Sequence, residues 1–89
     1  MKSKTTRVFR QMYLQLPMDV QSQARDTYKL FQENPHHPSL RFKKVHNTKP
    51  IYSVRINVNY RAVGVLDGDV IIWFWIGSHA EYDKLLDHI

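Results

Sequence analysis

The sequence contains no cysteine, and this absence limits both its chemistry and its means of stabilisation. Without cysteine the chain has no disulfide framework, no thiolate nucleophile and no thiolate metal site. The basic N-terminal segment lacks the apolar core of a signal peptide. The longest apolar run, residues 70–76, is far shorter than the roughly 20 residues that a membrane helix needs. We therefore expect a protein of a reducing compartment, the cytoplasm, with no membrane partner.

Glycine is also scarce, with three residues in the whole chain, and none of them belongs to a Gly-rich phosphate loop. His36, His37 and His46 are too scattered to provide the spacing of metal ligands. Neither a Ser-His-Asp arrangement nor a pair of catalytic carboxylates is recognisable. The sequence thus predicts no cofactor and no metal ion.

Acidic residues are few in the first half of the chain. Residues 1–50 carry ten Lys and Arg against three Asp and Glu, a net charge of +7, whereas residues 51–89 have a net charge of −2. A basic half of this kind attracts a polyanion such as nucleic acid, or an acidic protein partner. A solvated basic surface without a partner is the alternative. Within this half, we expect Arg41, Lys43 and Lys44 to extend a basic surface toward a nucleic-acid backbone.

What the sequence does contain is the pattern of a small α+β domain. Its length and its 43% hydrophobic content predict one folded domain over residues 1–89. Apolar residues recur at helical spacing over 6–16 and 18–33, and Pro17 between them predicts an antiparallel helical hairpin. Period-two patterning predicts four strands, over residues 40–45, 52–58, 60–66 and 70–76. The last strand is apolar throughout and is expected to be central, and a short helix over 80–89 follows it. The predicted fold is therefore a helical hairpin packed on a twisted antiparallel sheet of about four strands, with a short C-terminal helix.

The turns between the strands indicate which polar side chains meet. A tight turn at 57–59 places Arg55 opposite Arg61, and a tight turn at 67–69 places Arg61 opposite Trp75. The chain then leaves the sheet beside Arg61. Like charges directly opposite each other cost a few tenths to about 1 kcal/mol. The arginine pair therefore indicates either a nearby counter-ion or an anionic ligand such as an RNA phosphate.

The segment after the last strand supplies a candidate acid or base. His79 follows a Gly-Ser pair at the strand end, and an imidazole in water titrates at about pH 6.5, which suits proton transfer. In the non-catalytic alternative, its ring caps the following helix. Tyr82, one turn further on, either supplies a phenolic proton or belongs to the core. Glu81 and Asp83 are the candidate counter-ions for the arginine pair.

Four segments carry a resemblance to a known family. They are His-Pro-Ser-Leu (37–40), Tyr-Ser-Val-Arg-Ile (52–56), Tyr-Arg-Ala-Val (60–63) and Ile-Gly-Ser-His-Ala-Glu-Tyr-Asp (76–83). With two helices preceding the strands, the chain resembles the RelE/ParE superfamily of bacterial toxins over nearly its whole length. The strand that begins typical members is hard to see here, and only residues 2–7 offer one.

The resemblance implies a chemistry for the candidate residues. RelE-like members cut messenger RNA in the ribosomal decoding site by attack of the 2′-hydroxyl on the adjacent phosphate. That reaction needs a proton removed, the phosphorane stabilised and the leaving oxygen protonated. Arg61 matches the phosphate-stabilising arginine, Arg55 a basic position of the active strand, and His79 the position of a catalytic histidine or arginine. Tyr82 lies near the family's C-terminal tyrosine, whereas Ser53 stands where RelE has a lysine.

The resemblance favours a toxin that acts as an endoribonuclease, and it leaves two alternative functions open. A ribosome-dependent, metal-independent endoribonuclease would act on the ribosome and messenger RNA. A ParE-like protein would inhibit DNA gyrase without enzymatic chemistry, and a third kind of relative shows no toxicity. The acidic pair Glu81 and Asp83 beside the site counts against phosphate binding. The first two functions imply a cognate antitoxin, which we expect on the basic N-terminal half or on the apolar edge of the helices.

Overall fold

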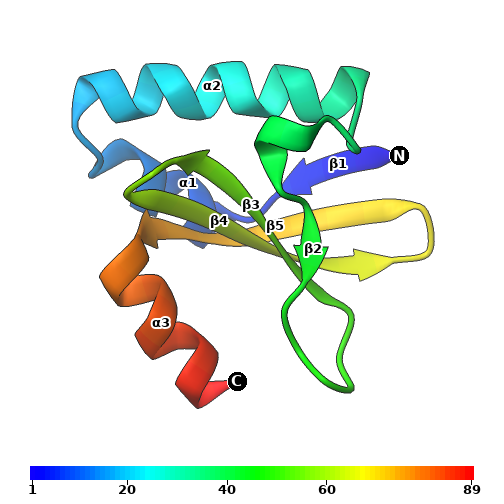
Figure 1. The fold of residues 1–89 in the computed structure, drawn as a ribbon. Helices are drawn as coiled ribbons and strands as arrows, with labels where there is room; N and C mark the ends of the chain where they lie inside the picture. Colours follow the sequence, from blue (N-terminus) through cyan, green and yellow to red (C-terminus); the bar gives the residue numbers. More distant parts are fainter.

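The computed structural model describes residues 1–89, and it begins with a strand that leads into the helical hairpin (Figure 1). Strand β1 (Lys2–Thr5) is followed by helix α1 (Arg7–Leu14) and helix α2 (Met18–Glu33). The Thr6 hydroxyl accepts the Phe9 backbone N–H at 3.1 Å, which caps the first turn of α1. Both helices are those predicted, although α1 ends two residues earlier. None of the helices is long and apolar enough to cross a membrane.

The rest of the chain supplies four strands and the last helix. They are β2 (Lys43–Lys44), β3 (Ile51–Asn57), β4 (Tyr60–Asp67), β5 (Val70–Ser78) and α3 (His79–His88). The sheet order is β1-β5-β4-β3-β2, in which β1 runs parallel to β5 and every other pair is antiparallel. The α+β fold is confirmed, with two corrections. The sheet is mixed and has five strands rather than four, and its central strand is β4, with the apolar β5 between β4 and β1.

The predicted strand over residues 40–45 is shorter than expected. Residues Pro38–Leu40 form a 3₁₀ turn, and Arg41 follows in the left-handed region, with φ 47° and ψ 42°. Arg41 is the one residue other than glycine with positive φ, and such a conformation interrupts a strand. Only Lys43–Lys44 then pair with β3, so the edge of β3 beyond Ser53 has no partner strand.

The sheet separates two apolar layers. The larger layer, on the side of α1 and α2, contains the eight buried residues Ala24, Phe31, Leu40, Val54, Ala62, Ile71, Trp73 and Ile76. The smaller layer contains Ile51, Val63 and Tyr82, with residues of α3 packed against them. Because strand side chains alternate between faces, the two layers identify which face each residue of β3 and β4 occupies.

A bulge sets the register between β4 and β5. Val63 lies opposite Trp75 and Gly64 opposite Trp73, so Phe74 has no partner on β4. A Cβ atom at Gly64 would lie 2.8 Å from the Trp73 side chain, so glycine allows the indole to lie against the strand. The bulge shifts the register by one residue and the two-residue turn that pairs Asp67 with Val70 shifts it by another, so Arg61 pairs with Gly77 rather than with Trp75.

Candidate functional site

Three arginines lie near one another at the end of the sheet where α3 begins. Arg55 on β3 pairs with Arg61 on β4, as the turn between them predicts. Arg41 lies in the left-handed turn before β2, outside the β2–β3 ladder, and it lines the same pocket as Arg55. The charges of Arg55 and Arg41 both act on Arg61. We call these three residues the arginine row.

The arginine row shares one face of the sheet with α3. The Tyr82 hydroxyl of α3 donates a hydrogen bond to the Ser53 Oγ at 3.1 Å. Arg55 is two residues beyond Ser53 on β3 and therefore projects from the same face. Arg61 lies directly opposite Arg55. Arg61 and α3 are thus on the face opposite the α1–α2 hairpin, whereas Arg41 and Arg55 also line a pocket at the β3 edge with Asp26, Thr27 and Leu30 of α2.

No carboxylate forms an ion pair with the arginine row, although Asp83 acts on Arg61 and Asp26 lines the same pocket as Arg41 and Arg55. The one ion pair in the chain joins His79 to Asp83, so neither Glu81 nor Asp83 is paired with an arginine. Burial lowers the pKa of Arg61, and the neighbouring Arg55 and Arg41 lower it further, against opposing effects of Tyr82 and Asp83. An anionic ligand would relieve this repulsion.

The Arg61 guanidinium is held in place by backbone carbonyls of the β3–β4 turn. Its Nη1 donates to the carbonyl oxygens of Asn57 at 2.6 Å and Tyr60 at 2.9 Å. A guanidinium has five N–H donors in a planar fork, and these two bonds leave the rest of the fork available. A fixed fork with free donors is well suited to a phosphate oxygen.

His79 is the first residue of α3 and is open to solvent. Its backbone N–H donates to the Asn59 carbonyl at 2.7 Å, which fixes the helix start beside the β3–β4 turn. Its Nδ1 lies 3.3 Å from Asp83 Oδ2. Ser78 caps the helix, because its Oγ accepts the Glu81 backbone N–H at 3.3 Å. The imidazole is therefore not needed as a cap.

Tyr82 lies in the core. It is 6% exposed, and its hydroxyl bonds to Ser53, which is itself 2% exposed. Its position matches the second of the two roles that the sequence left open. The structure thus places Arg41, Arg55, Arg61 and His79 at the same end of the sheet. The Tyr82 phenol is buried and is not exposed at this site.

The two lysines of β2 are exposed but point to different sides. Lys43 pairs with Ser53 and shares its face, so it extends the arginine row. Lys44 pairs with Tyr52, which packs against the larger core layer, so Lys44 belongs to the other face. The predicted basic surface therefore includes Lys43 and not Lys44.

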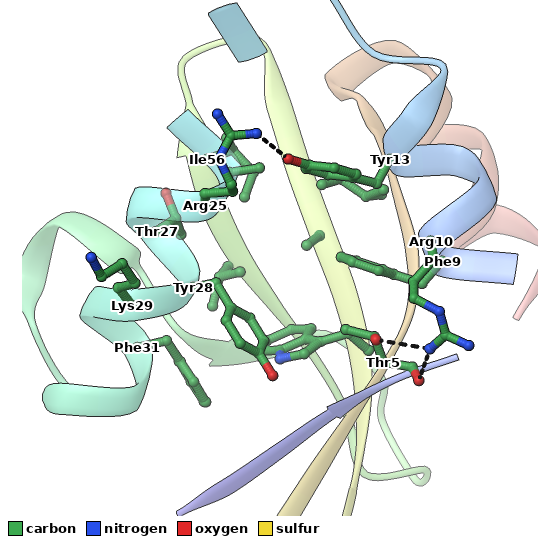
Figure 2. Close-up of a pocket in the computed structure, with 15 residues that line it drawn as sticks. Thr5, Phe9, Arg10, Tyr13, Arg25, Thr27, Tyr28, Lys29, Phe31 and Ile56 are labelled. Carbon is green, nitrogen blue, oxygen red and sulfur yellow. Dashed lines mark hydrogen bonds between the residues drawn. The ribbon is translucent and has the colours of Figure 1, made fainter. Parts of the chain in front are cut away.

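A groove that the sequence did not reveal opens on the other face, between α1 and α2 (Figure 2). Its volume is about 430 Å³, and its apolar lining includes Phe9, Tyr28, Phe31, Val54, Ala62 and Trp73. Arg10, Arg25 and Lys29 also line it, and no acidic residue does. The helical spacing of apolar residues predicts a face that packs on the sheet, but it does not show that the two helices stand apart.

Two cations of the groove have local hydrogen bonds. Arg10 donates to the Thr5 carbonyl oxygen at 2.8 Å, and Arg25 donates to the Tyr13 hydroxyl at 2.5 Å (Figure 2). Neither cation is in an ion pair. The groove therefore has an apolar floor and a positively charged rim, and no acidic residue lines it.

Comparisons with known proteins identify the fold as that of the RelE/ParE superfamily of toxins. The sequence model of the ParE-like toxin domain matches residues 18–84. The chain therefore belongs to the ParE-like toxin domain family. None of the curated proteins matches it in sequence.

Solved structures show the same fold at low identity. The chain is similar to a chain of the RelB-RelE antitoxin-toxin complex from Methanococcus jannaschii, with a TM-score of 0.75, 17% identity, and coverage of 92% of this chain and 96% of that chain. It is similar to YafQ from E. coli strain BL21(DE3), with a TM-score of 0.70, 10% identity, and coverage of 91% and 96%. It is also similar to the YoeB/ParE toxin from Agrobacterium tumefaciens, with a TM-score of 0.69, 15% identity, and coverage of 89% and 99%.

Proposed function

We propose that this protein is the toxin of a toxin–antitoxin pair and cuts messenger RNA on the ribosome. The observation that carries the proposal is the arginine row, which has no carboxylate partner and lies beside the exposed His79. Surface arginines that face each other repel, and a phosphodiester supplies the missing negative charge.

The geometry supports a division of roles. Arg55 and Arg41 would hold the phosphate, and the fixed fork of Arg61 would stabilise the charge that develops on the phosphorane. His79 would remove the proton of the 2′-hydroxyl. The O2′–P bond then forms and the P–O5′ bond breaks, which yields a 2′,3′-cyclic phosphate and a 5′-hydroxyl once the leaving oxygen takes a proton from water.

Two features favour a second function, the non-enzymatic inhibition of DNA gyrase. Tyr82 and Ser53 are both buried, so the site lacks an exposed phenol and the lysine that RelE has at the Ser53 position. A site with fewer proton-transfer groups suits binding better than catalysis.

The decisive experiment for the proposed function is primer extension on a translated message with the purified protein. We expect cuts within the message that require ribosomes and leave 2′,3′-cyclic phosphate ends. Gyrase-dependent DNA breaks on expression, with an intact message, would favour the second function instead. Intact message together with intact DNA would overturn both.

We propose the groove between α1 and α2 as the docking surface for the antitoxin. Its floor is apolar, and its rim carries Arg10, Arg25 and Lys29 without acidic residues. An amphipathic helix with acidic flanks complements such a surface in both shape and charge. One similar structure is itself an antitoxin-toxin complex, which is consistent with a protein partner here.

Charge reversal on the rim tests this assignment. We expect the double variant Arg25→Glu, Lys29→Glu to bind the antitoxin at least about tenfold more weakly, because like charges would then meet across the interface. The matched control is Lys43→Glu, Lys44→Glu, which changes the charge equally outside the groove. Calorimetry at two salt concentrations is the measurement, and the difference should shrink at high salt. Equal loss of affinity in both double variants would place the antitoxin elsewhere.

A further inference from the structure

Asp83 stands apart from the other acidic residues because it forms the one ion pair of the chain. Its Oδ2 lies 3.3 Å from Nδ1 of His79, one helical turn earlier on α3. The side chains are 48% and 63% exposed for His79 and Asp83. Exposed pairs of this kind contribute little to stability, at most about 1 kcal/mol. We therefore consider how Asp83 affects the orientation and the protonation of the His79 imidazole.

The contact assigns the two ring nitrogens. The Asp83 carboxylate lies 3.3 Å from Nδ1, and its negative charge favours hydrogen on that nearer nitrogen. In the neutral ring the proton is then on Nδ1, and Nε2 keeps a free lone pair. A free lone pair at Nε2 is what a general base requires.

Two further contacts restrict the imidazole. The ring of Tyr82 meets it edge-on, with ring centroids 5.7 Å apart and an interplanar angle of 62°. Tyr82 is itself fixed by its hydrogen bond to Ser53. The His79 backbone is tied to Asn59. The imidazole is therefore contacted by Tyr82 and Asp83 of α3, and the backbone that carries it is fixed to the β3–β4 turn.

The held ring lies on the side of α3 that faces the arginine row. Residues 79, 82 and 83 are three and four apart, so they share one side of the helix. Tyr82 and Asp83 both act electrostatically on Arg61, whereas the Glu81 carboxylate is the acceptor for the Ser78 hydroxyl at 3.5 Å. The ring, its carboxylate and the row thus form one cluster.

We propose that Asp83 is a positioning residue that holds His79 with Nδ1 protonated and Nε2 free to accept a proton. The proposal rests on the proposed nuclease function. In that reaction the 2′-hydroxyl proton moves to Nε2 as the O2′–P bond forms and the P–O5′ bond breaks, and the leaving O5′ takes a proton from water. The Asp83 carboxylate then stabilises the imidazolium without itself taking the proton.

The first test is spectroscopic and needs no activity. Nitrogen-15 NMR of the histidine rings, at a pH where His79 is neutral, distinguishes the two tautomers. We expect the Nδ1–H tautomer in the wild type and in Asp83→Asn, which keeps an oxygen acceptor, and a shift to Nε2–H in Asp83→Ala. An Nε2–H tautomer in the wild type, or no change in Asp83→Ala, would overturn the positioning role.

The second test separates rate from affinity. On ribosomes programmed with one message, we expect Asp83→Ala to cut about 10- to 100-fold more slowly at saturating protein, a part of what a general base contributes. The protein concentration at half-maximal rate should stay constant, because Asp83 does not touch the phosphate. The cleavage rate of Asp83→Asn should lie between the rates of the wild type and of Asp83→Ala. Asp87→Ala is the matched control, since it removes an exposed carboxylate one turn further along α3.

Together, the two tests distinguish a failure of the nuclease function from a failure of the positioning role of Asp83. If the wild type has the Nδ1–H tautomer but cuts no message, the nuclease function fails and the His79–Asp83 geometry holds. If the wild type cuts message and Asp83→Ala cuts as fast, the nuclease function holds and the positioning role is refuted. A higher half-maximal concentration with an unchanged maximal rate would show that Asp83 acts in binding, which also contradicts the proposal.

Discussion

Replacing Arg61 by alanine is expected to lower the rate of message cleavage by about 10²- to 10³-fold, the usual loss when one fixed donor to a developing charge is removed. Arg61 is the member of the arginine row whose guanidinium is anchored, through the carbonyls of Asn57 and Tyr60. Its free donors therefore need no reorganisation when the phosphorane forms. Primer extension at saturating protein measures the rate.

Two companion variants make the Arg61 result specific. Arg61→Lys keeps the positive charge but loses the planar fork, so we expect a rate between those of wild type and Arg61→Ala. Arg7→Ala removes an exposed arginine at the start of α1, on no part of the site, and should leave the rate unchanged. A full rate in Arg61→Ala would refute the role that we assign to this residue, provided that thermal unfolding shows the variant to be folded.

Replacing Phe31 by alanine is expected to destabilise the fold by about 3–5 kcal/mol. Phe31 is 1% exposed, and its ring packs edge-on against Phe42 at 5.0 Å and Trp73 at 5.2 Å between centroids. Small domains have roughly 5–15 kcal/mol of stability in total, so this single change removes a large share of it. Urea denaturation followed by tryptophan fluorescence measures the loss.

The control for Phe31 is an apolar residue that contacts little. Val8 on α1 is 58% exposed, and Val8→Ala should change the free energy of unfolding by no more than about 0.5 kcal/mol. Where Phe31→Ala is too unstable to purify, Phe31→Leu leaves a smaller cavity and should lose less. A loss under about 1 kcal/mol in Phe31→Ala would show that the layer between α2 and the sheet relaxes around the cavity.

The sequence predicts the correct face for the residues at the site end of the sheet, although its register between β4 and β5 is wrong by two residues. The sequence places Arg61 opposite Trp75, whereas the structure places it opposite Gly77. One residue of this shift arises because Asp67 pairs with Val70 across a two-residue turn, and the other arises from the bulge that skips Phe74. A shift of two residues preserves the face. The arginine pair itself depends only on the short β3–β4 turn, and it is confirmed.

Other features were beyond the reach of local patterns. Strand β1 has the sequence Lys-Ser-Lys-Thr, without an apolar alternation, because it is an edge strand. It is held by backbone pairing with β5 and by a hydrogen bond from the Trp73 indole to Ser3 at 2.8 Å. Likewise the left-handed Arg41 shortens β2 at a position where period-two patterning continues. The His79–Asp83 contact depends on where α3 starts, which the sequence placed one residue later.

The parallel pairing of β1 with β5 has a consequence for how the protein is made. Lys2 and Val70 are partners in the sheet although 67 residues separate them along the chain. The β3–β4–β5 meander closes through short turns, but β1 acquires its neighbour only when the last strand has left the ribosome. The first strand, which is synthesised earliest, is therefore among the last to be fixed. Until then the apolar faces of α1 and α2 lack the β5 part of their sheet, so the newly made chain is most vulnerable to proteases and to aggregation before its final 20 or so residues emerge.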